Sequence, residues 1–183
     1  MSTYFTSDQH FGHANILSYC NRPFSDVDEM NEALIDNWNS TVAPDDTVYV
    51  LGDLALGSLS ASLARTAELH GTKRLVPGNH DRPWEGHKKP SHHAAYEAAG
   101  FDILPSQVTL DLGVEVLLCH FPYVGDSHDT DRYTSMRPID VGGWLLHGHV
   151  HDSWKKRDRM INVGVDVWDF TPVHADELIT LMQ

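Results

Sequence analysis

Five short apolar segments of this sequence each run directly into residues that can bind a metal ion or carry a proton. The motifs that follow them are Asp8-Gln9-His10, Gly52-Asp53, Gly78-Asn79-His80-Asp81, Cys119-His120 and Gly148-His149-Val150-His151. Segments this short and apolar are typical of strands. Because ligand sites of open α/β sheets form at the carboxyl ends of the strands, we expect an α/β fold that brings all five motifs to one crevice.

The order of the other elements supports a layered α/β domain. Asp26 followed by Glu29 predicts a capping box at the start of the first of three helices. Strands and helices alternate in the first half and strands dominate the second, which predicts mixed sheets with helices around them. Residues 127–135, rich in aspartate and threonine, are expected to form a flexible loop. The predicted helices span residues 27–39, 58–70 and 91–99, and the strands 3–7, 47–51, 73–76, 108–112, 114–119, 143–146, 160–163 and 178–182.

Composition narrows the classes of function. The chain has 183 residues and no repeat or linker, which predicts a single domain over residues 1–183. A formal net charge of −13 argues against a protein that binds long nucleic acid through a basic face. No apolar run approaches the ~20 residues of a membrane span, and the N-terminus lacks a signal-peptide pattern. Two cysteines are too few for a disulfide framework or a cysteine zinc site, so we expect a cytoplasmic protein.

Each of the five motifs is weak evidence when taken alone. An Asp-x-His pair is short and common, and a Gly-Asp pair after a strand is usually a turn. Asn-His-Asp can cap a helix, and His-x-His can be a pair on a protein surface. If each motif had only such a structural explanation, many polar groups at strand ends would have no role. The combination therefore favours one site.

Taken together, the motifs resemble the signature of the calcineurin-like metallophosphoesterase superfamily. That signature runs D-x-H, G-D, G-N-H-D/E, H and G-H-x-H, and all five parts occur in this order between residues 8 and 151. The stretches at 10–16 (HFGHANI) and 162–166 (NVGVD) are similar to small, cap-less bacterial or phage-type members. The resemblance implies a layered α/β/β/α sandwich of mixed sheets flanked by helices.

The resemblance also implies two divalent metal ions and a division of their ligands. Two cations ~3.5–4 Å apart need a shared anionic ligand to offset their repulsion. Mixed carboxylate, amide and imidazole donors favour Mn²⁺ first, with Fe, Zn²⁺ or Ni²⁺ as alternatives, over Mg²⁺. The implied ligands are Asp8, His10 and His151 for one ion, Asn79, His120 and His149 for the other, and Asp53 as the bridge between them.

By the same resemblance, His80 and Asp81 are catalytic residues rather than ligands. His80 would protonate the leaving alkoxide or hold the transferring phosphoryl group. Asp81 would orient the His80 imidazole, and the alternative for Asp81 is a helix N-cap.

Four more residues are candidates for contact with the substrate. His13 and Asn15 lie just past the first motif, where a packing role is equally open. Most of the thirteen lysines and arginines lie in segments that leave or approach a motif, where an anionic substrate would arrive. Arg22 and Arg137 are the candidates from this group, and ordinary solvated loop charges are the alternative.

The resulting prediction is an enzyme that hydrolyses phosphate esters. A non-catalytic scaffold is the alternative, but scaffolds typically lose ligands or the catalytic histidine, and this chain keeps both. The short chain leaves no room for a cap domain, so we expect an open, shallow site. Such a site favours a phosphodiesterase that acts on nucleotides, cyclic nucleotides or nucleic acid ends, with a phosphomonoesterase or protein phosphatase as the alternative. Short nucleic acid fits this reading, long duplex does not, and the oligomeric state stays open.

Overall fold

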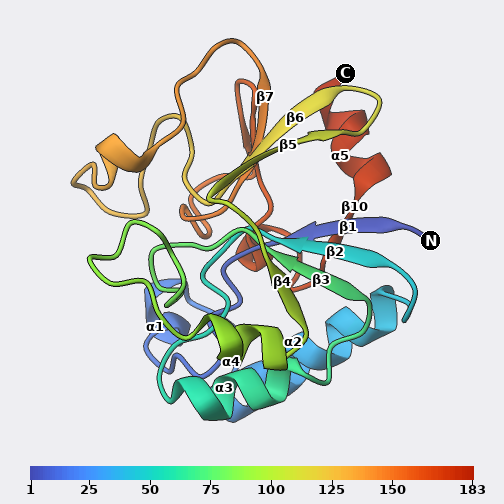
Figure 1. Cartoon of the computed structure of the whole chain (residues 1–183), viewed down its shortest axis with the longest axis vertical. Coiled ribbons are helices and arrows are strands. Elements are labelled where there is room, and N and C mark those ends of the chain that lie inside the picture. Colours follow the sequence, from blue (N-terminus) through green and yellow to red (C-terminus); the bar gives the residue numbers. More distant parts are fainter.

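Two five-stranded β-sheets form the centre of the protein in a computed structural model that describes residues 1–183 (Figure 1). The first sheet, in spatial order, consists of β10 (Val173–His174), β1 (Thr3–Thr6), β2 (Thr47–Val50), β3 (Thr72–Leu75) and β4 (Phe101–Ile103). The second consists of β5 (Gln107–Asp111), β6 (Glu115–Cys119), β7 (Trp144–His147), β9 (Met160–Asn162) and β8 (Lys156–Arg157). Strands β1 to β4 are parallel, as are β6, β7 and β9, whereas β10, β5 and β8 pair antiparallel. Both sheets are therefore mixed, as predicted.

Helices cover the face of the first sheet that points away from the second sheet (Figure 1). These helices are α2 (Val27–Thr41), α3 (Leu59–Thr66) and α4 (His93–Ala98). The other helical segments are α1 (Ile16–Tyr19), α5 (Ala175–Met182) and two 3₁₀ turns at Thr134–Met136 and Val165–Val167. None of the helices combines the length and the apolar character that a membrane crossing requires. The predicted sandwich of two mixed sheets flanked by helices is confirmed.

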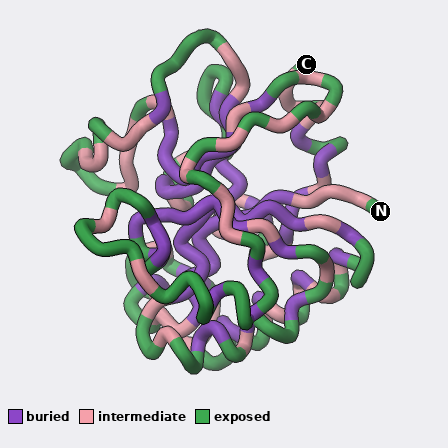
Figure 2. Tube along the Cα trace, in the orientation of Figure 1, coloured by how far each residue is buried: buried purple, intermediate pink, exposed green.

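The second strand shows why the core has two compartments. Val48 and Val50 pack with the helices, whereas Tyr49 and Leu51 pack between the two sheets. Successive side chains of a strand point to opposite faces, so a strand between two layers is apolar along its whole length. Figure 2 shows the result, with buried central strands and exposed outer helix surfaces.

Helix α2 begins where the sequence predicts. The carboxylate of Asp26 accepts hydrogen bonds from the N–H groups of Asp28 and Glu29, at 3.0 and 2.9 Å. These contacts satisfy donors that the start of a helix leaves free. Glu29 reaches back to the N–H of Ser25 at 2.7 Å instead of that of Asp26, so the capping box extends one residue further than predicted.

The predicted strand over residues 178–182 is wrong, because this segment belongs to helix α5. The Nδ1 atom of His174 accepts from the N–H of Asp176 at 3.1 Å and caps the helix start. Leu178 is fully buried and Leu181 is partly buried, which is helical spacing. Periodicity alone does not separate a short apolar helix from a strand. The sequence also did not predict α1, β4, β8 and β10, and the helix predicted over 58–70 ends at Thr66.

Candidate metal centre

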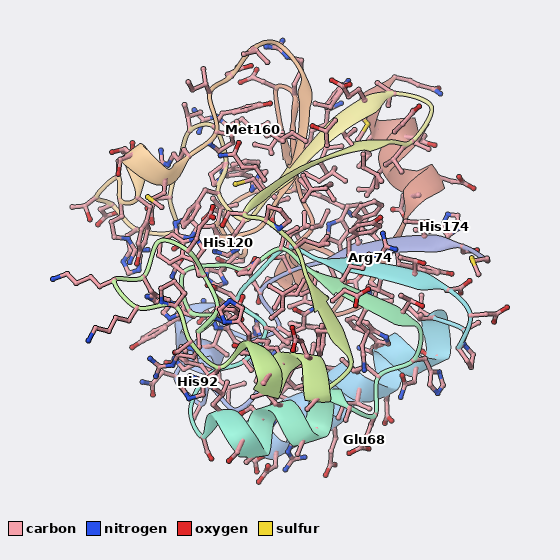
Figure 3. The ribbon with its side chains drawn as sticks, viewed as in Figure 1. Glu68, Arg74, His92, His120, Met160 and His174 are labelled. Atoms are coloured by element: carbon pink, nitrogen blue, oxygen red, sulfur yellow. The ribbon has the colours of Figure 1, made fainter.

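The five motifs meet where the two sheets approach each other. Three of them follow the parallel strands β1, β2 and β3, and two follow the parallel strands β6 and β7. The N–H of Asp8 donates to the carbonyl of Gly52 at 3.0 Å, and the N–H of Gly148 donates to the carbonyl of His120 at 3.0 Å. Figure 3 shows His120 at the junction of the two sheets. The structure thus brings the motifs together, as the strand ends predict.

The carboxylate of Asp53 lies at the middle of this arrangement. Its Oδ2 atom is 3.5 Å from Nε2 of His120, 3.8 Å from Nε2 of His10 and 3.9 Å from Nε2 of His80. These distances are too long for good hydrogen bonds. They do suit atoms that share a cation, because ligand bonds of ~2.0–2.2 Å place two donors of one ion roughly 3 to 4 Å apart. The position fits the bridging role predicted for Asp53.

The first predicted ligand group is compact, and three of its ring nitrogens make no hydrogen bond. Asp8, His10 and His151 have ligand atoms within 4.8 Å of one another. Both ring nitrogens of His10, and Nδ1 of His151, are buried without a hydrogen-bond partner. Each such orphan costs ~1–3 kcal/mol, and a cation would satisfy them. Burial also lowers the pKa of His10 well below its usual range, so its imidazole is neutral, as a metal ligand must be.

The second predicted ligand group, Asn79, His120 and His149, is suited to a cation for a different reason. Nδ1 of His120 lies 2.8 Å from the carbonyl oxygen of Leu51, which can only accept, so this nitrogen carries the proton. In the neutral form of the ring, Nε2 then holds the lone pair and faces Oδ1 of Asn79 at 3.1 Å and the Asp53 carboxylate. Three electron-rich atoms would repel one another unless a positive charge lies between them. The ring of the third predicted ligand, His149, has its centre 5.2 Å from that of His120.

Backbone strain is concentrated at these residues. Residues with side chains rarely adopt a positive φ, and strain of this kind gathers at functional sites. Two glycines let the strained loops come close together. A Cβ at Gly148 would overlap the side chains of Ser7 and Asp8, and one at Gly78 would overlap Asp53. Of the eleven non-glycine residues with positive φ, five are predicted ligands: Asp8, His10, Asp53, His149 and His151.

Comparison with known proteins agrees with this geometry. The calcineurin-like phosphoesterase family model matches residues 1–178. The chain belongs to this family. It is 36% identical to the gene 66 protein of Mycobacterium phage L5, over 99% of this chain and 94% of that protein. It is also 36% identical to MJ1445 of Methanocaldococcus jannaschii, over 98% of this chain and 90% of the relative. The crystal structure of AQ665 from Aquifex aeolicus, a protein of unknown function, superposes with a TM-score of 0.72 at 27% identity and covers 98% of each chain.

Calcineurin-like phosphoesterases are metal-dependent hydrolases that typically bind two metal ions. The buried aspartate and histidine groups of this chain are suited to such ions. This calcineurin-like phosphoesterase is therefore an enzyme of the metal-dependent hydrolase class.

In this phosphoesterase, Asp81 does not orient the His80 ring, which corrects the sequence prediction. The fully buried Asp81 carboxylate accepts from the N–H groups of Gly78, Asp53 and Leu54, at 2.9, 2.7 and 3.1 Å. The hydroxyl of Tyr96 is a fourth donor, at 3.3 Å. Four donors use the acceptor capacity of one carboxylate. Asp81 therefore holds the second and third motifs together, which the local pattern could not reveal.

His80 itself lies at the surface of the site. Its backbone N–H donates to Oδ1 of Asp53 at 2.9 Å, and its side chain is 43% exposed. The ring lines a cavity of about 230 Å³ above the predicted ligands. The substrate-facing role predicted for His80 is compatible with this position.

The four residues predicted to contact the substrate lie in different places relative to the cavity. His13 lines the cavity, whereas Asn15 is exposed outside it. Arg22 is buried, and its guanidinium donates to Asp166 and to the carbonyls of the first motif, so it supports that motif instead of meeting a substrate. Arg137 is also buried in a loop and does not line the cavity. The predictions for Arg22 and Arg137 are corrected accordingly.

Three residues of the site were not singled out by the sequence. Tyr19 and Arg132 line the cavity, and Asp126 contacts His149 at 3.3 Å. The only signal for Arg132 was its place among the basic residues that approach a motif. Asp126 and Tyr19 carry no local signal, because their roles depend on contacts between distant parts of the chain.

Proposed function

We propose that this protein is a phosphodiesterase that acts on nucleotides, cyclic nucleotides or nucleic acid ends. The observation that carries the proposal is a second cavity of about 240 Å³ beside the one over the predicted ligands. A phosphodiester carries two ester groups, and two adjoining spaces offer a place for each. The residues that line both cavities are Ile16, Tyr19, Ser127, His128 and His151.

The proposed metal site uses the ligands that the motifs predict. Asp53 would be shared by the two ions. One ion would be held by Asp8, His10 and His151, and the other by Asn79, His120 and His149. The donor set favours Mn²⁺, with Fe, Zn²⁺ and Ni²⁺ as alternatives. When bound, such ions activate water at neutral pH and stabilise the charge that develops on the phosphoryl group.

His80 is the proposed general acid. It lines the cavity, and its side chain is exposed enough to reach a bound ester. Its Nε2 lies 3.9 Å from the Asp53 carboxylate, on the side of the ring that faces the predicted ligands. In this position the ring would deliver a proton to the leaving alkoxide.

The position of Tyr19 favours a substrate that carries an aromatic base. Its side chain is 68% exposed and lines both cavities, so the ring can lie beside a group attached to the phosphorus. Stacking on an aromatic side chain is tolerant of base identity. Arg132 is the only lysine or arginine that lines the cavity over the predicted ligands, in a protein with net charge −13. This limited positive charge favours a small or short substrate over a long duplex.

The test is a panel of substrates with protein stripped by EDTA and reloaded with Mn²⁺. The panel contains bis(4-nitrophenyl) phosphate, 4-nitrophenyl phosphate, cyclic nucleotides, a dinucleotide and a phosphopeptide. We expect the diesters to have the higher kcat/KM and EDTA to abolish hydrolysis. Faster cleavage of the monoester or phosphopeptide would favour a phosphomonoesterase or protein phosphatase instead. Hydrolysis that survives chelation would contradict the proposed mechanism.

A further inference from the structure

We propose that Asp126 is a positioning residue that makes His149 a metal ligand through Nδ1, and that it also places Arg132 over the substrate cavity. Asp126 lies in the loop between β6 and β7, outside all five motifs. The inference rests on the metal site of the proposed function.

The contact between Asp126 and His149 determines which ring nitrogen is free. Oδ2 of Asp126 lies 3.3 Å from Nε2 of His149, and the Asp126 side chain is only 1% exposed. Arg132 and Arg137 both lie beside this carboxylate, at 2.8 and 3.7 Å, and complement its negative charge. An ionised carboxylate only accepts hydrogen bonds, so Nε2 of His149 carries the proton and Nδ1 holds the lone pair.

The two histidines of the second ligand group are thus held in opposite ways. His120 is fixed at Nδ1 by the carbonyl of Leu51 and presents Nε2. His149 is contacted at Nε2 by Asp126, which leaves the lone pair on Nδ1. Carboxylates that hold a ligand histidine in this manner set its tautomer and raise its basicity.

Asp126 also holds Arg132, through both of its carboxylate oxygens. Its Oδ1 accepts from Nη2 and Nε of Arg132 at 2.8 and 3.2 Å, and its Oδ2 accepts from the Arg132 N–H at 2.9 Å. The Arg132 side chain remains 38% exposed and lines the cavity. Its guanidinium is therefore available to a phosphate oxygen, and guanidinium groups recognise phosphate well.

An aromatic cluster fixes this loop beside His149. The centre of the Tyr133 ring lies 5.6 Å from that of His149 and 5.1 Å from that of Phe121. Tyr133 has a φ of 55°, which a tyrosine seldom adopts without such support. A purely structural ion pair would explain the contact between Arg132 and Asp126. It would not explain why the buried carboxylate also faces a predicted ligand.

The first test measures Mn²⁺ binding without substrate, by the electron paramagnetic resonance signal of free Mn²⁺. Asp126→Ala should weaken one of two sites by ~10–100-fold and leave the other unchanged. Asp126→Asn should bind Mn²⁺ more tightly than Asp126→Ala, because the amide oxygen can still accept from Nε2. Asp129→Asn, an exposed position in the same loop, is the matched control and should leave both affinities unchanged. Equal Mn²⁺ affinities in Asp126→Ala and the unaltered protein would overturn the inference.

The second test uses unaltered protein and does not depend on the folding of a variant. Long-range ¹H–¹⁵N correlation spectra of the Zn²⁺-loaded protein identify the metal-bound nitrogen of each histidine. We expect Nδ1 for His149 and Nε2 for His120. Coordination of His149 through Nε2 would contradict the role of Asp126.

The third test concerns Arg132. Arg132→Ala should still bind two Mn²⁺ ions, because Arg137 remains beside Asp126, and should raise KM for a diester. Arg132→Lys should recover part of the loss. An unchanged KM in Arg132→Ala would exclude the proposed contact with substrate. The metal and tautomer measurements need no substrate, so their failure is separate from a failure of the proposed phosphodiesterase activity.

Discussion

Arg22 and Asp166 form a two-pronged ion pair beneath the first motif, although 144 residues separate them in the chain. Nε and Nη2 of Arg22 lie 2.7 and 2.9 Å from the two carboxylate oxygens of Asp166. The side chains are 0% and 2% exposed. The same guanidinium donates to the carbonyls of Asp8 and Gln9, at 2.7 and 2.9 Å. The pair therefore ties the start of the chain to the segment after β9 and holds the backbone from which Asp8 projects.

We expect Arg22→Ala to lower the free energy of unfolding by about 3–5 kcal/mol, because it removes the guanidinium that pairs with both oxygens of the buried Asp166 carboxylate. Arg22→Lys should be intermediate, since a single ammonium cannot replace the fork of a guanidinium. Urea denaturation of each variant measures these values.

The matched control for Arg22 is Arg65→Ala. Arg65 pairs with Asp28 at the surface, with side chains 36% and 69% exposed. Loss of an exposed pair should cost only ~0.2–1 kcal/mol. A cost for Arg22→Ala no greater than that for Arg65→Ala would show that the buried pair does not stabilise the fold.

Gly148 should be intolerant of a side chain because of its packing. A Cβ there would overlap the side chains of Ser7 and Asp8. We expect Gly148→Ala to cost ~1–3 kcal/mol of stability and to weaken the Mn²⁺ site that contains Asp8. Gly143→Ala is the control from the same segment, since a Cβ at Gly143 has no neighbour within 4 Å. Calorimetry and Mn²⁺ titration of the two variants measure the difference, and equal effects would contradict the packing argument.

The motifs predicted the convergence of the site because each one ends a strand, and parallel strands end at the same edge. The contacts of Asp81, Arg22 and Asp126 could not be predicted in this way. Asp81 resembles a partner for its neighbour His80, yet it accepts from amides 27 and 28 residues earlier. Asp126 contacts a histidine 23 residues later. Such contacts follow from how loops fold back on one another, and local sequence carries no periodic signal for them.

The lack of a clear local signal also explains why helix α5 was predicted as a strand. The residues 178–182 are mostly apolar, and a short apolar segment is compatible with either a strand or a helix. The cap that decides the matter is an imidazole nitrogen of His174 rather than a preferred capping residue. The first-turn acids Asp176 and Glu177 were the available signal for a helix.

Asp53→Asn should weaken both predicted metal sites together. The carboxylate lies between the two groups, and its Oδ2 lies within 3.8 Å of His10 and His120. Elemental analysis of Mn²⁺-loaded protein should give nearly two ions per chain for the unaltered protein and clearly fewer for the variant. Loss of only one ion, with the other affinity unchanged, would argue against a bridging role.

His80→Ala should keep both metal ions while turnover falls by ~10²–10⁴-fold, which is typical for a positioned general acid. The loss should be smallest for a nitrophenolate, because a good leaving group needs little protonation. His120→Ala is the comparison and should lose the second ion along with activity. Metal content and turnover are measured for leaving groups of low and high pKa.

Two outcomes would revise the role of His80. Loss of a metal ion from His80→Ala would make His80 a ligand. An equal loss of turnover for every leaving group would mean that the ring holds the phosphoryl group instead of delivering a proton.

Tyr19 provides the sharpest test of a nucleotide substrate. Thymidine 5′-(4-nitrophenyl phosphate) and methyl 4-nitrophenyl phosphate share a leaving group and differ only in the nucleoside. If the base stacks on Tyr19, Tyr19→Ala should raise KM for the thymidine diester by about 5- to 150-fold, because stacking contributes ~1–3 kcal/mol per base and each 1.4 kcal/mol is tenfold. KM for the methyl diester should stay within a factor of about two. Tyr19→Phe keeps the ring and should behave like the unaltered protein, and all three proteins should bind two Mn²⁺ ions. An equal change in KM for the two diesters would place the base elsewhere and leave Tyr19 as a general wall of the cavity.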